Sequence, residues 1–276
     1  MVEKIVRTCF SAQFATNTTI SGTVLVHLLA AVLRRHKKKD KGTNDNSSFS
    51  EAISTLPSLY ITCTSPFQEV EEFVSDSIKR YNLRLVRQAG GMKEALERYL
   101  QNDSHEQEVS TDSTSHQNGS TRSIKAIFVG TRRTDPHGST CRVALNSIAH
   151  PFPTDDLQPR IKTDPGWPEV ERVHPILDWN YNDVWDFLRC PIFAVRQSDA
   201  QQFSWGAPYG VPYCSLYDEG YTSLGSTFNT FPNPVLDTRK GQPIKEEEDR
   251  FSHRLLPAYR LDDENQERAG RSSSRS

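Results

Sequence analysis

The sequence predicts a three-layer α/β/α fold with a mostly parallel sheet, followed by an irregular C-terminal extension. Helix and strand signals alternate between residues 24 and 129, as expected when helices connect parallel strands. Beyond the helix that follows Asn180, the chain is rich in Gly, Pro, Tyr and Asn and has few regular signals. We therefore expect a core in residues 1–190 and an extension with a disordered tail in residues 191–276.

The first signals read helix, strand, helix. Residues 24–36 are apolar nearly all round, which is typical of a helix packed against a sheet. Residues 59–61 predict a strand. A second helix is expected from Ser65, with Pro66 at its first helical position and Gln68 three residues after the cap. Its apolar side chains keep helical spacing, namely Phe67, Val70, Phe73, Val74, Ile78 and Tyr81.

The next signals complete the alternating pattern. Residues 83–86 predict a strand, and the glycine pair 90–91 leads into a helix with one apolar face. Residues 124–129 form an apolar run typical of a buried parallel strand. Asn180 is expected to cap a further helix that has Asp183 in its first turn.

Two polar segments interrupt this pattern. Residues 40–50 and 102–123 lack the apolar side chains needed to order themselves, which predicts disordered insertions. Residues 24–33 are strongly apolar, but they are about half the length of the ~20 residues that a spanning helix needs. The basic run 34–39 follows directly. We interpret this region as a buried helix with a solvated basic end, and a membrane anchor or nuclear signal is the alternative.

Composition excludes several classes of protein. The chain has 276 residues with 33 basic and 35 acidic side chains. Because these charges nearly cancel, the composition argues against a protein dedicated to binding nucleic acid or a membrane surface. Its five cysteines are widely spaced and form no C-x-x-C pair, which indicates reduced thiols rather than a zinc site or disulfides. We expect a cytoplasmic monomer without nucleic-acid or membrane partners.

The segment Gly-Thr-Arg-Arg-Thr-Asp-Pro at residues 130–136 predicts a phosphate site at the end of the 124–129 strand. Gly130 permits a close backbone approach, and Arg132 and Arg133 offer charged donors to phosphate oxygens. Asp135 beside them suits a direct or water-mediated contact with Mg²⁺. The alternative is a surface turn with a local Arg–Asp salt bridge.

The segment Thr-Asp-Pro-Gly-Trp-Pro at residues 163–168 places Asp164 and Trp167 on one turn. An aromatic plane beside a hydrogen-bonding carboxylate suits a flat heteroaromatic ring with N–H groups, such as a flavin. The alternative is that Trp167 only packs under its loop. Near the C-terminus, Arg268 and Arg271 flank an Ala-Gly pair, and they either remain in solvent or fold back as a phosphate clamp.

Together these segments resemble the eukaryotic FAD synthases (FMN adenylyltransferases) of the fungal type, within the PAPS reductase-like adenine-nucleotide fold. The resemblance covers most of residues 57–272 outside the insertions. The motifs that carry it lie at residues 130–136, 163–168, 172–179, 183–188, 213–225, 232–234, 257–259 and 267–271.

This resemblance implies transfer of AMP from Mg·ATP to FMN, which yields FAD and pyrophosphate, with residues 191–276 contributing to the flavin site. By analogy, Asp135 would act catalytically at Mg²⁺ and the phosphates, and Asp164 and Trp167 would bind the flavin. Arg268 and Arg271 would act on phosphate groups, both in binding and in catalysis. The other substrate-binding residues implied are Gly130, Thr131, Arg132 and Arg133.

The chain departs from this family before residue 23. The family carries a Ser-x-Asn-Gly-Gly-Lys-Asp-Cys loop that holds the ATP phosphates, whereas residues 17–22 read Asn-Thr-Thr-Ile-Ser-Gly. Either ATP binding is lost or reshaped, or the N-terminal segment reflects an imperfect gene model joined to an intact core. The alternatives to FAD synthesis are a catalytically impaired flavin- or nucleotide-binding homologue and a sulfonucleotide reductase-like enzyme. The latter relies on a cysteine in its tail, and no cysteine follows Cys214.

Overall fold

The computed structural model divides into two compact units. The sheet unit comprises residues 1–17, 21–62 and 77–178, and the loop unit comprises residues 18–20, 63–76 and 179–276. Within these limits the structure describes residues 12–16, 19–40, 55–108, 124–135, 157–193, 210–238 and 255–272. Each unit is described by itself below.

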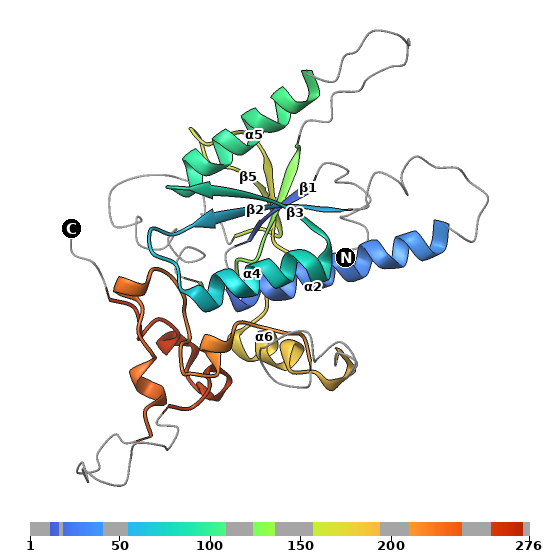
Figure 1. Cartoon of the computed structure of the whole chain (residues 1–276). Coiled ribbons are helices and arrows are strands. Elements are labelled where there is room, and N and C mark those ends of the chain that lie inside the picture. The colour runs from blue at the N-terminus through green and yellow to red at the C-terminus, as the bar shows by residue number, and fades with distance from the viewer. Residues whose placement is uncertain are drawn as a thin grey trace, which may run out of the picture. The chain divides into compact units, whose positions relative to one another are not determined.

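The sheet unit contains a six-stranded sheet with the order β3-β2-β1-β4-β6-β5 (Figure 1). Every pair is parallel except β5 with β6, so the predicted mostly parallel sheet is confirmed. The bounds are β1 Ala12–Thr16, β2 Leu56–Thr62, β3 Leu83–Ala89, β4 Ala126–Val129, β5 Arg160–Lys162 and β6 Glu171–Val173.

Strands β1, β5 and β6 were not expected from the sequence. Strand β5 has the sequence Arg-Ile-Lys and β6 has Glu-Arg-Val, and β5 lies at the edge of the sheet. Three-residue strands with charged side chains have no apolar run to reveal them, because half of their surface faces solvent. Strand β1 is short and mixes Gln and Thr with its apolar residues, although it lies inside the sheet between β2 and β4.

The described α-helices are α2 Ile20–Asp40, α4 Gln68–Tyr81, α5 Met92–Glu108 and α6 Tyr181–Leu188. All four were expected, but their bounds differ. Helix α4 begins at Gln68 rather than at Pro66, and α5 continues through residues 102–108 of the segment expected to be a disordered insertion. The remainder of that insertion and residues 41–50 lie outside the described residues.

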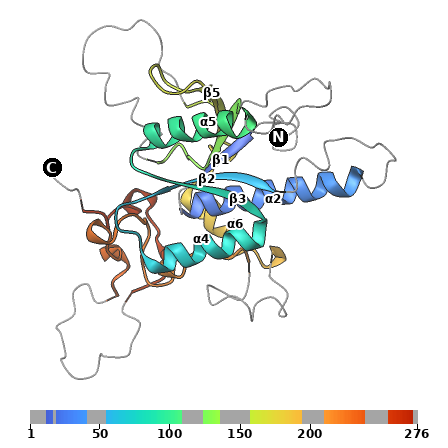
Figure 2. The ribbon, with the colours of Figure 1, turned by 45° about the horizontal axis from the view of Figure 1, so that its top comes forward.

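Two apolar clusters hold α2 and α5 against opposite faces of the sheet, as Figures 1 and 2 show. On one face, α2 packs on the sheet through Leu25, Val26, Leu29 and Ala30, which contact Leu56, Leu83, Ala126, Phe128 and Val173. On the other face, α5 packs through Leu96 and Tyr99, which contact Leu59, Ile127 and Val170. The three-layer α/β/α prediction is therefore confirmed.

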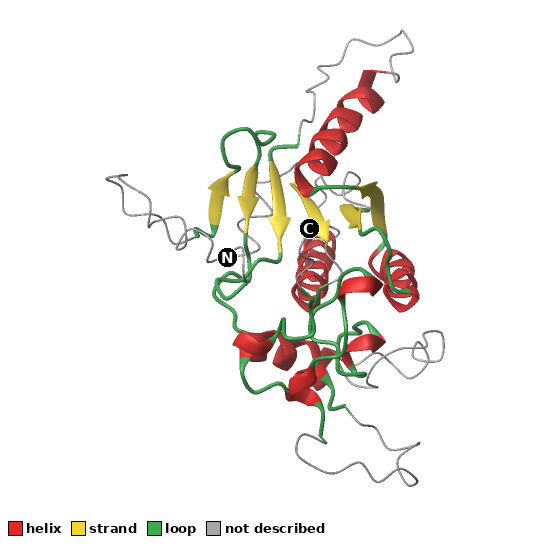
Figure 3. Ribbon diagram, turned by 90° about the vertical axis from the view of Figure 1, so that its left-hand side faces the viewer, coloured by secondary structure: helices red, strands yellow, loops and turns green. Residues whose placement is uncertain are grey.

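The loop unit is built from α6, the first part of α4, short 3-10 helices and connecting loops (Figure 3). Asn180 caps α6 in a capping box with Asp183, as its sequence position predicted. Trp185 is buried and makes edge-on contacts with Tyr181, Tyr213, Tyr217 and Tyr259. The 3-10 helices are η3 Pro191–Phe193, η4 Ser215–Tyr217, η5 Thr227–Asn229, η6 Pro234–Leu236, η7 Ala258–Arg260 and η8 Glu264–Gln266.

The apolar run at residues 24–33 lies within α2, whose first half is buried against the sheet. None of the helices among the described residues has the length and apolar character needed to cross a membrane. Cys63, Cys190 and Cys214 are free thiols. Cys9 and Cys141 lie outside the described residues.

Candidate functional site

The sheet order creates a switch point between β1 and β4. From β1 the chain builds β2 and β3 on one side, and β4 then lies on the other side of β1. In open α/β sheets, ligands bind outside the carboxyl ends of the strands where the direction of winding reverses. The 130–135 turn follows β4 directly and therefore begins at this switch point, as expected. Pro136 lies outside the described residues.

Gly130 is required by the close approach of the first turn of α2. A Cβ atom placed at this position would lie 3.0 Å from the carbonyl carbon of Ser21 and 3.1 Å from the backbone nitrogen of Gly22. Because both contacts are to backbone, neither neighbour can move aside cheaply. The glycine thus seats the turn against α2, and Thr131 beside it is half-buried.

Arg132 and Asp135 form an ion pair inside this turn. The carboxylate accepts from Arg132 Nη2 at 2.7 Å and Nε at 3.2 Å through Oδ1, and from the Arg132 backbone nitrogen at 2.8 Å through Oδ2. The local salt bridge considered as the alternative is therefore present. However, the Arg132 side chain is only 2% exposed, so this pair lies in the interior and locks the shape of the turn.

Arg133 ties the turn to the segment that follows β6. Its Nε donates to Asp178 Oδ1 and its Nη1 to the carbonyl of Leu157, both at 2.7 Å. The backbone nitrogen donates to the carbonyl of Leu177 at 2.9 Å. The Arg133 side chain remains 40% exposed, so it stays within reach of a ligand.

Asp135 has room for one metal bond. A carboxylate has about four lone-pair positions, and the three hydrogen bonds from Arg132 leave one of them. No group of three or more His, Cys, Asp or Glu side chains in the described part of the chain is arranged to hold a metal. The remaining position on Asp135 could take one bond from Mg²⁺, which commonly uses one or two carboxylates together with substrate phosphates and water.

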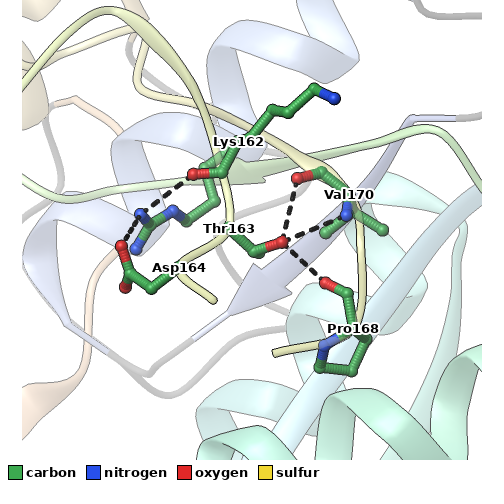
Figure 4. A network of polar contacts seen from close by, with 6 residues as sticks. Lys162, Thr163, Asp164, Pro168 and Val170 are labelled. Atoms are coloured by element: carbon green, nitrogen blue, oxygen red, sulfur yellow. Dashed lines mark hydrogen bonds and ion pairs between the residues drawn. The ribbon is translucent and has the colours of Figure 1, made fainter. Parts of the chain in front are cut away.

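The 163–170 loop connects β5 to β6 and is held rigidly by Thr163 (Figure 4). The Thr163 hydroxyl donates to the carbonyl of Pro168 at 2.7 Å and accepts from the backbone nitrogen of Val170 at 3.2 Å. Within the loop, the backbone nitrogen of Trp167 donates to the carbonyl of Asp164 at 3.0 Å. This turn needs a residue with positive φ, which Gly166 supplies at 83°.

Arg172 on β6 holds the carboxylate of Asp164. Its Nη2 donates to Asp164 Oδ1 at 3.2 Å and to the carbonyl of Lys162 at 3.3 Å (Figure 4). Asp164 is still 62% exposed. The carboxylate is thus oriented and remains accessible to a ligand.

Trp167 is half-buried between the sheet unit and an open cavity. It packs against the α5-side cluster of the sheet unit, as the structural alternative required. It also lines an open cavity of about 460 Å³ on the α5 side of the unit. The remaining lining residues are Glu97, Leu100, Gln101, Gly166 and Pro168.

The structure separates the two segments that the sequence suggested as one site. Strand β6 is parallel to β4. The loop before β6 therefore lies at the amino ends of the parallel strands, and the turn after β4 lies at their carboxyl ends. The reason is that antiparallel β5 carries the chain back across the sheet before Asp164. The two segments are therefore separated by about the length of the four-residue strand β4, which is roughly 13 Å at about 3.3 Å per residue.

In the loop unit, backbone and side-chain hydrogen bonds dock the C-terminal segment. The backbone nitrogen of Phe231 donates to the carbonyl of Gly270 at 2.9 Å, and Thr230 pairs with Arg271 as a β-bridge. Asn233 is fully buried, and its Nδ2 donates at 2.8 Å both to Thr222 Oγ1 and to the carbonyl of Gln266. The segment that was expected to fray is therefore fixed through residue 272.

Arg268 and Arg271 both lie on this docked segment, with Arg268 exposed and Arg271 half-buried. Neither forms an ion pair with another described residue. Burial lowers the pKa of Arg271 from its ordinary value, and the charge of Arg268 lowers it further, while Cys63 acts in the opposite direction. An anion beside this pair would offset both the burial and the mutual repulsion.

Sequence reasoning did not single out Arg172, which holds Asp164, or Asn233, which bonds to the C-terminal segment. Each lies inside a segment used for the resemblance, but only spatial neighbours reveal what it does. Arg172 and Asp164 come together because β5 and β6 pair in an antiparallel hairpin. A buried asparagine between two prolines was the one local signal for Asn233.

Because His174 is buried, we expect the folded protein to lose stability in mild acid. His174 follows β6, is 4% exposed, and neither ring nitrogen has a hydrogen-bond partner among the described residues. Burial, aided by Arg172, lowers the pKa of His174 from 6.5 to about 4. The unfolded chain therefore takes up a proton between pH 6.5 and 4 that the folded chain does not, so stability falls across this window.

We expect a slope of up to about 1.4 kcal/mol per pH unit from this one group. Urea unfolding of the wild type and of His174→Phe at several pH values measures it. Between pH 6.5 and 4, the free energy of unfolding of the variant should change less steeply with pH, by up to about 1.4 kcal/mol per pH unit. Equal slopes would contradict the assignment.

Comparison with known proteins places this architecture in a family. The phosphoadenosine phosphosulfate reductase domain matches residues 11–190. A Schizosaccharomyces pombe protein named "Probable FAD synthase" is 32% identical over 222 residues, which is 80% of this chain. The flavin adenine dinucleotide synthase of Saccharomyces cerevisiae is 26% identical over 197 residues, or 69% of this chain.

Among solved structures, Candida glabrata FMN adenylyltransferase in complex with FAD and inorganic pyrophosphate is similar, with a TM-score of 0.64 and 25% identity. That match covers 95% of this chain and 81% of the other. The chain spans 60% of the length of the S. pombe relative and 47% of the S. cerevisiae one. The domain match covers well over half of the sequence, and the chain therefore belongs to the phosphoadenosine phosphosulfate reductase domain family.

Proposed function

We propose that this chain is an FMN adenylyltransferase, which transfers AMP from Mg·ATP to FMN and releases FAD and pyrophosphate. The observation that carries the proposal is the similarity, over 95% of the chain, to an FMN adenylyltransferase whose structure holds FAD and pyrophosphate. The relatives named as FAD synthases support it.

The geometry of the sheet unit supports the same choice of ligand. The loop with Trp167 and Asp164 lies at the amino ends of the parallel strands, and the turn with Arg132 and Arg133 lies at their carboxyl ends. An elongated molecule with a flat ring at one end and a phosphate at the other could contact both. FMN has this layout, because its ribityl chain separates the isoalloxazine ring from the phosphate.

In this reaction the protein mainly has to position the substrates and neutralise their phosphate charge. An oxygen of the FMN phosphate attacks the α-phosphorus of ATP, a new P–O bond forms, and the bond to the pyrophosphate leaving group breaks. The attacking oxygen is already anionic, so no general base is needed. Catalysis then rests on in-line alignment and on neutralising the phosphate charge.

Each predicted residue has a role in this proposal. Asp164, held by Arg172, would accept a hydrogen bond from the flavin ring, and Trp167 would pack against that ring. Arg268 and Arg271 would hold phosphate groups, and together with Asp135 they are the proposed catalytic residues. The turn of Gly130, Thr131, Arg132 and Arg133 would line the phosphate end. When bound at Asp135, Mg²⁺ supplies positive charge to the phosphates.

A binding protein without turnover is the alternative, and residues 17–22 favour it. No Lys, Asp or Gly-Gly pair stands between β1 and α2, so the donors that would cradle ATP are missing at this place. We also propose a cytoplasmic monomer that binds neither nucleic acid nor membranes, on the strength of its balanced charge and free thiols.

Incubation with FMN, ATP and Mg²⁺, followed by chromatography, tests the proposal. The wild type is expected to form FAD. Trp167→Ala should weaken FMN binding by about tenfold, since stacking on an aromatic contributes roughly 1–2 kcal/mol, whereas Trp167→Phe should retain most of the affinity. FMN binding without FAD formation would establish the binding protein instead.

A further inference from the structure

Gly225 lies directly beneath the guanidinium of Arg271 in the loop unit. A Cβ atom at position 225 would come within 2.5 Å of Arg271 Cζ and closer still to both Nη atoms. No side chain fits this space while Arg271 stays where it is. The backbone of Gly225 does not itself require glycine, because its φ is not in the left-handed region. A side chain at position 225 would therefore displace the Arg271 guanidinium rather than the backbone.

The main chain of Arg271 is already fixed independently of Gly225. It forms the β-bridge with Thr230, and its backbone nitrogen donates to the carbonyl of Arg268 at 2.9 Å. What remains to be set is the direction of a long, flexible side chain. Glycine at position 225 leaves the space in which the guanidinium lies against the backbone, and a side chain there would exclude the guanidinium from this space.

The charge of Arg271 is not used within the described structure. It forms no ion pair with a described residue, and its buried Nε has no hydrogen-bond partner among them. A guanidinium offers five donors in a fixed planar fork, so its orientation decides which phosphate oxygens it can reach. An arginine held in place before the ligand arrives also loses less conformational entropy on binding.

We propose that Gly225 is a positioning residue that orients the Arg271 guanidinium for a diphosphate group. The proposal rests on the proposed function for the identity of the ligand, and it adds a residue that acts only through Arg271. The orientation depends on the missing side chain at position 225, because this is where the guanidinium lies against the backbone.

A double-mutant cycle tests this inference with inorganic pyrophosphate as the probe. The variants are Gly225→Ala, Arg271→Ala and the double variant, each compared with the wild type by calorimetric titration and by thermal unfolding. Gly91→Ala is the matched control, because its new methyl group would meet only the carboxylate end of the exposed, flexible Glu94 side chain. FAD formation by the wild type is measured separately.

Gly225→Ala should weaken pyrophosphate binding by about tenfold, similar to the loss of a charged hydrogen bond. Arg271→Ala should do the same, and the double variant should bind no more weakly than Arg271→Ala alone. Gly225→Ala should also lower Tm, and removal of the Arg271 side chain should restore part of that loss. Gly91→Ala should behave as the wild type.

The outcomes separate this inference from the proposed function. The predicted coupling without FAD formation would leave Gly225 correctly assigned and refute the adenylyltransferase. Additive effects on binding or Tm, wild-type affinity in Gly225→Ala, or no pyrophosphate binding by the wild type would each overturn the inference, whether or not FAD is formed.

Discussion

Replacing Arg268 and Arg271 together by alanine is expected to reduce FAD formation by at least about a hundredfold, since preorganised charge at a developing phosphate anion is worth this much or more. The physical basis is that neither guanidinium has an ion-pair partner among the described residues, so their positive charge remains for the substrate. Turnover is measured by chromatography of FAD. The fold should survive, because the segment is docked by backbone bonds and by Asn233 rather than by these side chains.

Two controls make this result specific. Arg260→Ala removes an exposed arginine from the same part of the chain, where its guanidinium lies 5.8 Å from the ring centroid of Tyr259, and should leave turnover unchanged. Thermal unfolding should give the double variant a Tm close to that of the wild type. Full turnover in a folded double variant would show that the C-terminal segment does not act on the phosphates.

Removing the Asn233 side chain should destabilise the loop unit by about 2–4 kcal/mol, as expected for three buried hydrogen bonds. Its Nδ2 donates to the Gln266 carbonyl and to Thr222, and its Oδ1 accepts from the backbone nitrogen of Val235 at 2.9 Å. The side chain is fully buried, so water cannot replace these partners without a rearrangement. Urea unfolding of Asn233→Ala measures the effect.

Because Asn233 anchors the segment that carries Arg268 and Arg271, Asn233→Ala should lower FAD formation as well. Asn233→Asp keeps the shape and the acceptor, but it replaces the donor by an oxygen facing the Gln266 carbonyl, so it should be nearly as damaging. Asn265→Ala, at an exposed asparagine on the same segment, should cost less than about 0.5 kcal/mol. Comparable losses at positions 233 and 265 would refute the anchoring role.

Local periodicity was enough to predict the helices and strands that carry long apolar stripes or runs. The four described α-helices and strands β2, β3 and β4 were all expected, and Asn180 was identified as a helix cap from residue types alone. The same signals failed for β5 and β6, where charged side chains alternate over three residues. They also failed for the end of α5, whose polar residues 102–108 continue the helix that begins at Met92.

For the candidate site, residue types indicated which side chains suit a phosphate or a ring, but not their spatial arrangement. The prediction that Gly130 admits a ligand stays a prediction, and the structure adds its close approach to the backbone of α2. The same holds for Arg132 as a phosphate ligand, to which the structure adds its burial and its pairing with Asp135. Short-range patterns do not encode such burial or an approach between distant segments.

The amino-acid sequence by itself determined that this chain is an α/β protein of the phosphoadenosine phosphosulfate reductase domain family, because helix spacing, apolar runs and motif residues are local properties. Only the tertiary structure decided that the Asp164 loop and the Gly130 turn lie at opposite ends of the strands, that Asn233 bonds to the C-terminal segment, and that the Arg271 guanidinium lies against Gly225. The physical reason is that strand order, register and close backbone approach depend on contacts between residues far apart in the chain.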